Sequence, residues 1–165
     1  MSFQLAHLKS QSMPHVEEKD GAEDEAFYNG ALLVETGGGE YAEIADPFTV
    51  GQIDGVALHR YGVDRTDPYA GTPSFDITGG IGINPGRVLA IQLGQGDRNL
   101  LFSAQYVGTL PEQTGGSYGV IRDTDGRWKV NFANTTNGVV RLESLAWTED
   151  PINKGRVIVS FLEAE

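Results

Sequence analysis

The chain has 165 residues and a mass of 17.8 kDa, the size of a single domain. It contains no cysteine, so disulfides, thiolate metal sites and thiol nucleophiles are excluded. Its 12 lysine and arginine residues stand against 23 acidic residues, and this formal net charge of -11 argues against a nucleic-acid partner bound by a basic surface.

The composition also predicts the fold class and the compartment. The 22 glycines and 7 prolines predict many tight turns, which favours short strands over long helices. No apolar run of about 18 residues is present, so we expect no membrane-spanning helix and no membrane partner. The amino-terminal residues lack the apolar core of a signal peptide, so we expect the protein to be made in the cytoplasm. Together with the composition, this predicts an acidic, soluble, all-β protein.

The amino-terminal segment differs from the rest of the chain. Six acidic residues lie between Glu17 and Glu25, and the apolar residues around them show no alternation of period two. We expect residues 1–27 to form an extended acidic arm, in which a short helix at residues 2–10 would be marginal. Two interpretations stay open: a disordered solubilising tail, or an arm whose apolar residues dock on a neighbouring subunit.

From residue 28 onward, apolar runs bounded by turn residues predict a series of short strands. The expected strands span residues 28–35, 41–45, 53–61, 87–93, 100–107, 118–122, 127–132, 140–143 and 156–162. Asp125 and Gly126 predict a two-residue type I′ turn between two of them. This series indicates a compact antiparallel β-barrel or sandwich over residues 28–165.

Two of these strands carry further information. In residues 127–132, Trp128 falls on the apolar side of an alternating pattern, so we expect its side chain in the core. Residues 156–162 are apolar on both faces apart from Ser160, which predicts a central strand of a sheet.

Residues 62–86 interrupt the series with six glycines and three prolines in 25 positions. A connection of this length in a compact domain is usually functional or contains an unrecognised strand, which we expect at residues 74–78. We therefore expect an excursion that projects from the barrel and contacts another molecule. The residues expected to contact the partner or a neighbouring subunit are Phe3, Leu5, Leu8, Val16, Tyr69 and Phe75.

Several fragments imitate catalytic or binding motifs. Residues 115–119 match the G-x-S-x-G nucleophile motif, but that motif needs a histidine after the serine, and the last histidine, His59, precedes Ser117. Residues 123–126 resemble the start of a calcium loop, yet Arg127 stands where the fifth position needs an oxygen ligand. Both fragments are better explained as turns.

No other motif predicts a site. The glycine clusters at residues 79–86 and 94–96 lack the spacing of phosphate-binding loops, and the three histidines, His7, His15 and His59, lack zinc-ligand spacing. We expect no cofactor, no metal and no catalytic residue. Paired carboxylates for glycoside hydrolysis leave no local mark, so that alternative stays open.

A family resemblance appears at residues 94–165, and more loosely at residues 28–93. The matching motifs are Tyr106-Val107-Gly108-Thr109, Tyr118-Gly119-Val120, Asp125-Gly126-Arg127-Trp128-Lys129-Val130, Thr135-Thr136 and Gly155-Arg156-Val157-Ile158-Val159. In this order they resemble the small head decoration, or cement, proteins of tailed bacteriophages. These motifs are turns and core strands, so they are more specific to a fold than to a function.

The resemblance implies a β-barrel or tulip-like domain on the outer surface of a virion. It implies a non-enzymatic structural protein, usually a homotrimer at three-fold positions, that bridges major capsid protein subunits and stabilises the expanded head. Two other functions stay open: a different virion part, such as a tail or fibre-attachment module, and a carbohydrate-binding β module that uses Trp147 and residues 62–86.

Overall fold

The fold is seen in a computed structural model, which describes residues 3–5, 16–20, 30–45, 53–57, 74–76, 80–83, 87–93, 100–149 and 155–162. In these residues the chain forms thirteen β-strands and no helix, which confirms the predicted all-β class. No helix in the described ranges is long and apolar enough to cross a membrane. The strands are β1 (Gln4–Leu5), β2 (Val16–Asp20), β3 (Leu32–Glu35), β4 (Tyr41–Glu43), β5 (Gly55–Ala57), β6 (Ser74–Asp76), β7 (Gly80–Ile83), β8 (Arg87–Gln92), β9 (Phe102–Val107), β10 (Ser117–Arg122), β11 (Trp128–Asn131), β12 (Val140–Ser144) and β13 (Arg156–Phe161).

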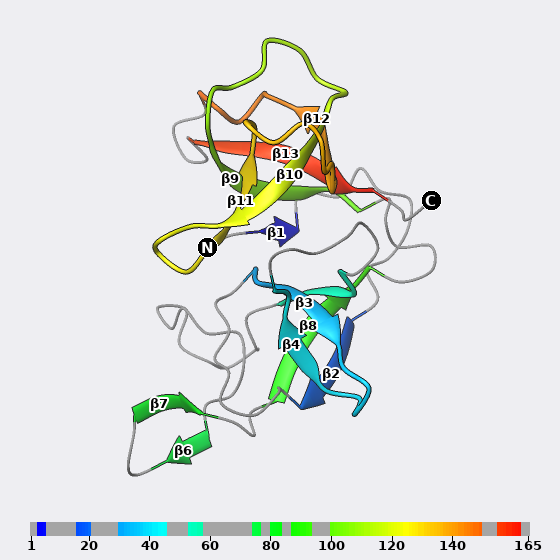
Figure 1. The fold of residues 1–165 in the computed structure, drawn as a ribbon, viewed down its shortest axis with the longest axis vertical. Coiled ribbons are helices and arrows are strands. Elements are labelled where there is room, and N and C mark those ends of the chain that lie inside the picture. Colours follow the sequence, from blue (N-terminus) through cyan, green and yellow to red (C-terminus); the bar gives the residue numbers. More distant parts are fainter. Residues whose placement is uncertain are drawn as a thin grey trace.

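The carboxy-terminal strands close into a small barrel, the upper part of the molecule in Figure 1. Their order is β9-β11-β10-β12-β13, and β13 pairs back onto β9. Neighbouring strands are antiparallel except β9 and β11, which run parallel. The β13 strand lies between β12 and β9, so its predicted central position is confirmed. Closure of the ring leaves no free edge among these five strands.

The hairpin between β10 and β11 is confirmed, but its turn is longer than expected. The Gly126 amide donates to the Asp123 carbonyl at 2.9 Å, and the Asp123 amide donates to the Arg127 carbonyl at 2.8 Å. The connection therefore has a three-residue loop that ends at Gly126, whose φ of 80° lies in the left-handed region. A turn followed by a left-handed glycine is the usual form of a three-residue hairpin, whereas the expected type I′ turn has two residues.

The second sheet is open and lies below the barrel in Figure 1. Its order is β2-β8-β5-β3-β4, and all its neighbours are antiparallel. The β6–β7 hairpin forms a separate two-stranded sheet at the end of the molecule away from the barrel. The strand expected at residues 74–78 is thus confirmed as β6, whereas its partner β7 was not expected.

One apolar cluster joins the two sheets. It includes Leu32 and Leu33 from β3, Phe102 from β9, and Trp128, whose side chain is 2 % exposed as predicted. Fully burying one such side chain contributes about 1.5–3 kcal/mol. The alternation in β11 has its expected effect, because Trp128 and Val130 are buried while the residues between and after them are half-buried. The barrel and the open sheet therefore share a core.

The described parts of the expected arm are built into this fold. The β1 strand pairs with β9, placing Gln4 opposite Ser103, and β2 pairs with β8 along its full length. These strands were not expected, and β1 replaces the marginal helix. Strand pairing was missed because the partners β8 and β9 come from far along the chain, and no local pattern in the acidic segment encodes them. The remaining residues of the segment lie outside the described ranges.

Candidate functional site

The structure distributes the predicted contact residues over separate parts of the molecule. Phe3 and Leu5 belong to the β1 region on the barrel, Val16 to β2 of the open sheet, and Phe75 to β6 in the distant hairpin. Leu8 and Tyr69 lie outside the described residues. The described members therefore do not form one continuous surface, and their role as contact residues stays a prediction.

Phe3 occupies a different place from the one expected for a docking residue. Its side chain is 2 % exposed, and its ring centroid lies 5.3 Å from that of Phe161. Phe161 in turn contacts Phe102 edge to face, also at 5.3 Å. Such aromatic pairs contribute about 0.5–1.5 kcal/mol beyond the burial of their area. Phe3 therefore stabilises the barrel of its own chain, and β1 would have to leave β9 before Phe3 could contact a neighbour.

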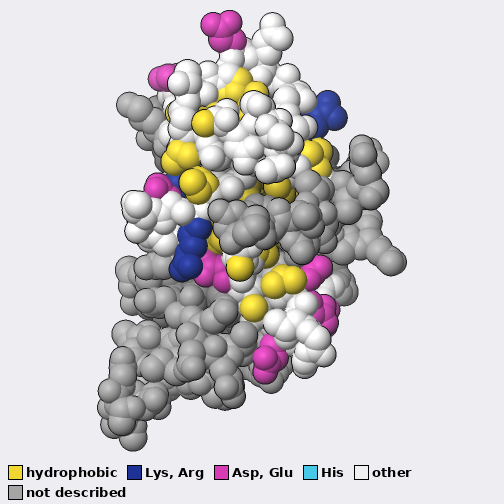
Figure 2. Space-filling model, in the orientation of Figure 1, with side chains coloured by type: hydrophobic (Ala, Val, Ile, Leu, Met, Phe, Trp, Pro, Cys, Tyr) yellow, Lys and Arg dark blue, Asp and Glu magenta, His cyan; other side chains and the backbone are white. Residues whose placement is uncertain are grey.

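Val16 and Ile121 are the large apolar side chains that the described residues leave on the surface, at 42 % and 38 % exposure. Val16 lies on the edge strand β2 of the open sheet, and Ile121 lies on β10 of the barrel. Figure 2 shows one face of the molecule, on which acidic side chains are spread over the described surface and basic ones are few. An edge strand with an exposed valine and acidic neighbours is a suitable place for a protein contact.

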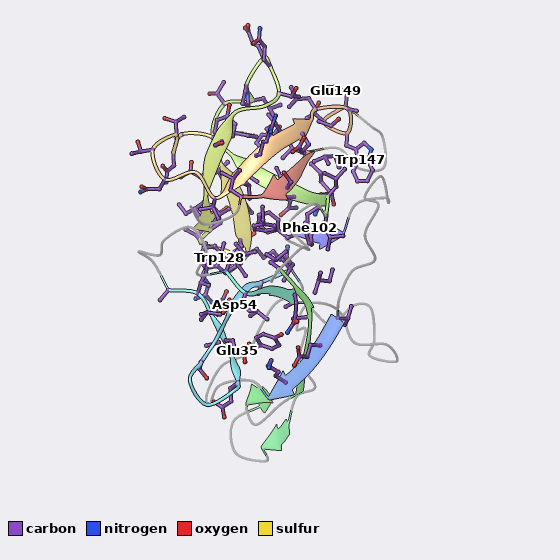
Figure 3. The ribbon with its side chains drawn as sticks, turned by 90° about the vertical axis from the view of Figure 1, so that its right-hand side faces the viewer. Glu35, Asp54, Phe102, Trp128, Trp147 and Glu149 are labelled. Atoms are coloured by element: carbon purple, nitrogen blue, oxygen red, sulfur yellow. The ribbon has the colours of Figure 1, made fainter. Side chains whose placement is uncertain are left out.

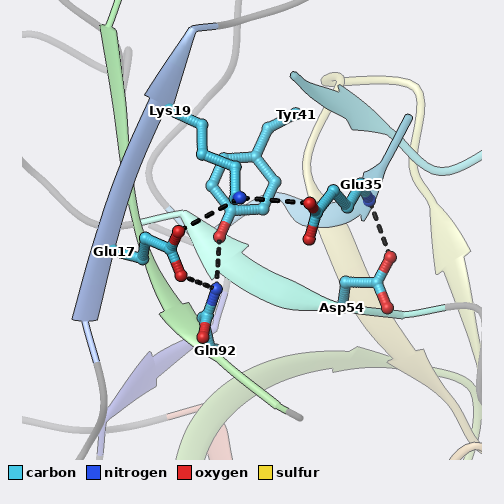
Figure 4. Close-up of polar contacts among 6 residues, drawn as sticks. All are labelled: Glu17, Lys19, Glu35, Tyr41, Asp54 and Gln92. Atoms are coloured by element: carbon cyan, nitrogen blue, oxygen red, sulfur yellow. Dashed lines mark hydrogen bonds and ion pairs between the residues drawn. The ribbon is translucent and has the colours of Figure 1, made fainter. Parts of the chain in front are cut away.

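A cluster of polar side chains ties β2 to the far side of its own sheet (Figure 4). Lys19 of β2 places its Nζ 3.1 Å from Glu17 Oε1 and 3.0 Å from Glu35 Oε1 of β3. In the strand order, β8 and β5 lie between β2 and β3. The Lys19–Glu35 contact therefore requires a strongly curled sheet, in which β2 approaches β3 across the concave face.

Tyr41 of β4 fills the inside of this curl. Its ring lies 5.8 Å from Lys19 Nζ, and its hydroxyl accepts a hydrogen bond from Gln92 Nε2 at 3.3 Å. The same Gln92 amide donates to the Glu17 carboxylate. Beside them, the Glu35 amide donates to Asp54 Oδ2 at 2.7 Å, which fixes the end of β3 (Figure 4).

The protonation states in this cluster suit a structural role. Hydrogen bonds to Glu35 and Glu17 raise the pKa of Lys19, and burial raises the pKa of Tyr41. At neutral pH the lysine keeps its proton and is no nucleophile, and the tyrosine keeps its proton and is no general base. The cluster can hold strands together, but these two groups are poorly suited to proton transfer or covalent chemistry.

A second polar contact joins the barrel to the open sheet. Glu43 of β4 has a side chain that is 10 % exposed, and its Oε1 accepts a hydrogen bond from Trp128 Nε1 at 2.6 Å. Its Oε2 lies 3.4 Å from a guanidinium nitrogen of Arg122, the residue that pairs with Trp128 across the hairpin. Figure 3 shows Trp128 where the barrel meets the open sheet. Sequence reasoning missed Glu43, since nothing local distinguishes it among 23 acidic residues.

The acidic residues that imitate a calcium loop bind a lysine of their own hairpin. Lys129 Nζ lies 2.6 Å from Asp123 Oδ2 and 3.1 Å from Asp125 Oδ2. The hydrogen bond from Lys129 lowers the pKa of Asp123, and the hydrogen bond from the Arg127 amide lowers the pKa of Asp125. The hydrogen bond to Asp123 raises the pKa of Lys129. These groups therefore form a charged pair network at the turn.

The serine of the G-x-S-x-G fragment lies at the start of a strand. Ser117 is exposed and begins β10, so the strand-to-helix turn that a nucleophile motif requires is not formed there. The turn expected for this fragment is wrong for its second half, because Ser117 to Gly119 belong to β10. All three histidines of the chain lie outside the described residues, and no group of metal ligands occurs within the residues that are described.

Trp147 and the described part of residues 62–86 lie far apart. Trp147 is half-buried in the loop after β12, at the barrel end of the molecule (Figure 3). The β6–β7 hairpin, which is the described part of residues 62–86, lies at the opposite end. Trp147 and this hairpin therefore do not form a joint platform for a sugar.

Comparison with known proteins gave no match, whether against protein-family models, curated proteins or solved structures.

Proposed function

We propose that this chain is a non-enzymatic capsid decoration protein that binds the outside of an expanded phage head. In this role it bridges major capsid protein subunits and stabilises the shell, as a homotrimer with contacts to neighbouring subunits. It is made in the host cytoplasm and resides on the outer surface of the virion.

The observation that carries the proposal is the placement of the resembling motifs. They fall on β9, β10, β11 and β13 and on the turns beside them, so they belong to one closed barrel. Because the motifs all lie in one compact barrel, they support a resemblance of the whole domain and not a chance match of short sequence motifs.

Two of these motifs also depend on each other physically. A Cβ atom at Gly119 would lie 2.5 Å from the side-chain nitrogen Nδ2 of Asn134 and 2.8 Å from its Cγ, so any larger residue would displace Asn134. The Gly119 amide donates to the Asn134 carbonyl at 2.8 Å, and Asn134 Oδ1 accepts the amide of Thr136 at 3.2 Å. The glycine of the Tyr118-Gly119 motif is thus required by the turn that contains the Thr-Thr motif, which supports reading the motifs as one unit.

The charge of the chain is consistent with this role. A formal net charge of -11 keeps closely spaced copies soluble and disfavours binding to packaged DNA. The polar clusters around Lys19, Glu43 and Lys129 are made of side chains that bind one another. Such clusters stiffen a body that must withstand load, which is what the proposed role needs.

The proposal is tested by binding to capsids. Purified protein is mixed with expanded heads that lack decoration, and bound protein is measured by co-sedimentation over a range of concentrations. We expect saturable binding and a rise in the temperature at which the heads break. Binding that does not saturate, or binding to tails instead of heads in electron micrographs, would contradict the proposal.

A matched pair of variants locates the contact. Val16→Glu and Ile121→Glu each place a charge on an exposed apolar position, one on the open sheet and one on the barrel. We expect Val16→Glu to weaken capsid binding while Ile121→Glu binds as the parent does. The reverse result would move the contact to the barrel. Deletion of residues 2–25 is a poor test, because it removes Phe3 from the core and β2 from its sheet.

The trimer is tested separately by sedimentation equilibrium of the free protein and by electron cryomicroscopy of decorated heads. We expect density for three copies around each three-fold position. Isolated single copies at other positions would contradict the homotrimer without affecting the binding result.

A further inference from the structure

The sequence contains the dipeptide Asn-Gly twice, at Asn29-Gly30 and at Asn137-Gly138. In such a dipeptide the glycine has no Cβ, so its backbone nitrogen can reach the side-chain carbon of the preceding asparagine. Whether this contact leads to reaction in a folded protein depends on two things. The glycine amide must be free of a hydrogen bond, and the asparagine side chain must be free to rotate.

Asn137 and Gly138 meet both conditions. Asn137 is exposed in the turn between β11 and β12, and its side-chain amide makes no hydrogen bond to any residue that the structure describes. Among the described residues, the Gly138 amide likewise donates no hydrogen bond. The chain is fixed on both sides, since the Asn137 amide donates to Asn134 Oδ1 at 3.2 Å and the Val139 amide donates to the Tyr118 carbonyl at 2.8 Å.

The other asparagines offer internal comparisons. The Gly30 amide is buried and donates to the Ala57 carbonyl at 2.8 Å, so this nitrogen is engaged. Asn131 Oδ1 accepts the Ala133 amide at 3.1 Å, and the bulky Phe132 follows it. Asn134 Oδ1 accepts two backbone amides and is followed by a β-branched threonine. Each of these positions lacks at least one condition that Asn137 meets.

We propose that Asn137 is a site of spontaneous deamidation in the folded protein. The Gly138 nitrogen loses its proton and attacks Cγ of Asn137, forming a C–N bond, and the Cγ–Nδ2 bond breaks to release ammonia. Water then opens the resulting cyclic imide. Opening at the side-chain carbonyl gives aspartate, and opening at the main-chain carbonyl gives isoaspartate, in which the backbone runs through the side chain.

The position of the turn gives this reaction a structural consequence. A Cβ atom at Gly138 would lie 2.8 Å from the Ser117 Cβ, so the turn packs closely on the start of β10. Isoaspartate inserts an extra carbon into the backbone between two fixed points, the Asn134 and Val139 hydrogen bonds. We expect the nearby pairing of Tyr118 with Val140 to loosen. The product also carries one more negative charge on a chain that already has a net charge of -11.

The experiment uses the purified full chain and does not depend on the capsid role. The folded protein is incubated in mildly alkaline buffer, which favours loss of the glycine amide proton, and a parallel sample is kept in denaturing urea. Peptide mass spectrometry then measures conversion at each asparagine, and isoaspartate is detected as a methyl acceptor of an isoaspartyl methyltransferase. In the folded sample we expect conversion at Asn137 to exceed that at Asn29, Asn131 and Asn134 several-fold.

The denatured sample separates structure from sequence. In urea, Asn29 and Asn137 are expected to react at similar rates, because both precede glycine and neither glycine amide is protected. Asn137→Gln serves as the matched variant, since the longer side chain forms the cyclic imide far more slowly. It should remove the product at this position and leave the fold intact. An Asn137 that stays unconverted in the folded protein while it reacts in urea would overturn the proposal, as would equal conversion at Asn29 in the folded state.

Discussion

The barrel and the open sheet differ in how their outermost strands are stabilised. The barrel is made from one continuous stretch, β9 to β13, and the pairing of β13 with β9 closes it. The open sheet collects β2, β3, β4, β5 and β8 from separated parts of the chain before residue 93, and it ends in the edge strands β2 and β4. In the closed barrel, every strand pairs with a neighbour on both sides through backbone hydrogen bonds. In the open sheet, side-chain contacts stabilise the edge strands instead.

Each edge strand of the open sheet has a side chain that makes such a contact. Lys19 holds the β2 edge to Glu35 across the curl, and Glu43 holds the β4 edge to the hairpin of the barrel. We therefore expect the barrel to tolerate loss of polar contacts better than the open sheet does. The shared apolar cluster, in contrast, should couple the two regions.

The largest expected effect comes from removing the shared core. Trp128→Ala should lower the free energy of unfolding by about 3–5 kcal/mol, because it leaves a cavity between the two regions. Denaturant unfolding followed by circular dichroism measures the loss, and amide exchange reports whether both sheets open together. Trp147→Ala, at a half-buried loop position, is the control and should cost far less. Independent unfolding of the two sheets in the parent protein would break the idea of one cooperative core.

Phe3 provides the next test, since it decides whether the amino-terminal segment belongs to the barrel. Phe3→Ala should cost about 3 kcal/mol, near the lower end for a buried aromatic residue, because β1 has two residues and its neighbours can relax. Thermal and urea denaturation measure the effect. Val16→Ala, at an exposed position of the same segment, should stay within about 0.5 kcal/mol of the parent. Equal, small effects of both changes would mean that the segment is a tail in solution.

Glu43 tests the contact between the two regions. Glu43→Gln should lower stability by about 1–3 kcal/mol, because the carboxylate that accepts the Trp128 N–H and faces Arg122 loses its charge. A double-mutant cycle with Trp128→Phe measures the coupling, which we expect at about 0.5–3 kcal/mol. Additive effects of the two changes would show that the hydrogen bond between them contributes nothing measurable.

Lys19 tests the β2 edge alone, with a smaller expected effect. Lys19→Met should speed amide exchange in Val16–Asp20 while exchange in β9 to β13 stays unchanged, because the ion pairs act locally. High salt should reproduce part of this effect in the parent protein by screening the ion pairs. Lys129→Met, a lysine change at the barrel hairpin, is the control and should leave β2 exchange as it is. Faster exchange throughout the barrel after Lys19→Met would contradict the local role.

The smallest expected effect is a pH dependence at the hairpin. The lowered pKa values of Asp123 and Asp125 mean that their contribution to stability is complete above the ordinary value of 3.8 and is lost as the pH falls through the lowered values. The raised pKa of Lys129 means that its contribution is complete below 10.5 and is lost as the pH rises beyond it. Lys129→Met should therefore lower the melting temperature slightly across the neutral range, and the difference from the parent should vanish in strong acid. A difference that grows in acid would exclude the ion pairs as its cause.

The sequence predicted the barrel strands well because their signals are local. Alternation placed Trp128 in the core, the apolar run of residues 156–162 marked a central strand, and Asp125-Gly126 located the hairpin. The turn length was missed, since an Asp-Gly pair fits both a two-residue and a three-residue loop. The candidate contact residues were chosen as apolar residues that we expected to be exposed. The burial of Phe3 shows that an apolar residue in an acidic segment need not be exposed. The local sequence around such a residue is the same whether its side chain is exposed or is buried by a strand from a distant part of the chain.

Local sequence is enough to predict where the chain extends and where it turns, because backbone preference and side-chain alternation act over a few residues. The strand order, the closure of β13 on β9 and the burial of Phe3 became known only from the three-dimensional fold. The same is true of the contacts of Lys19 with Glu35 and of Glu43 with Trp128. These features join residues that are distant along the chain. Their physical basis is the burial of a shared apolar surface, which no local pattern encodes.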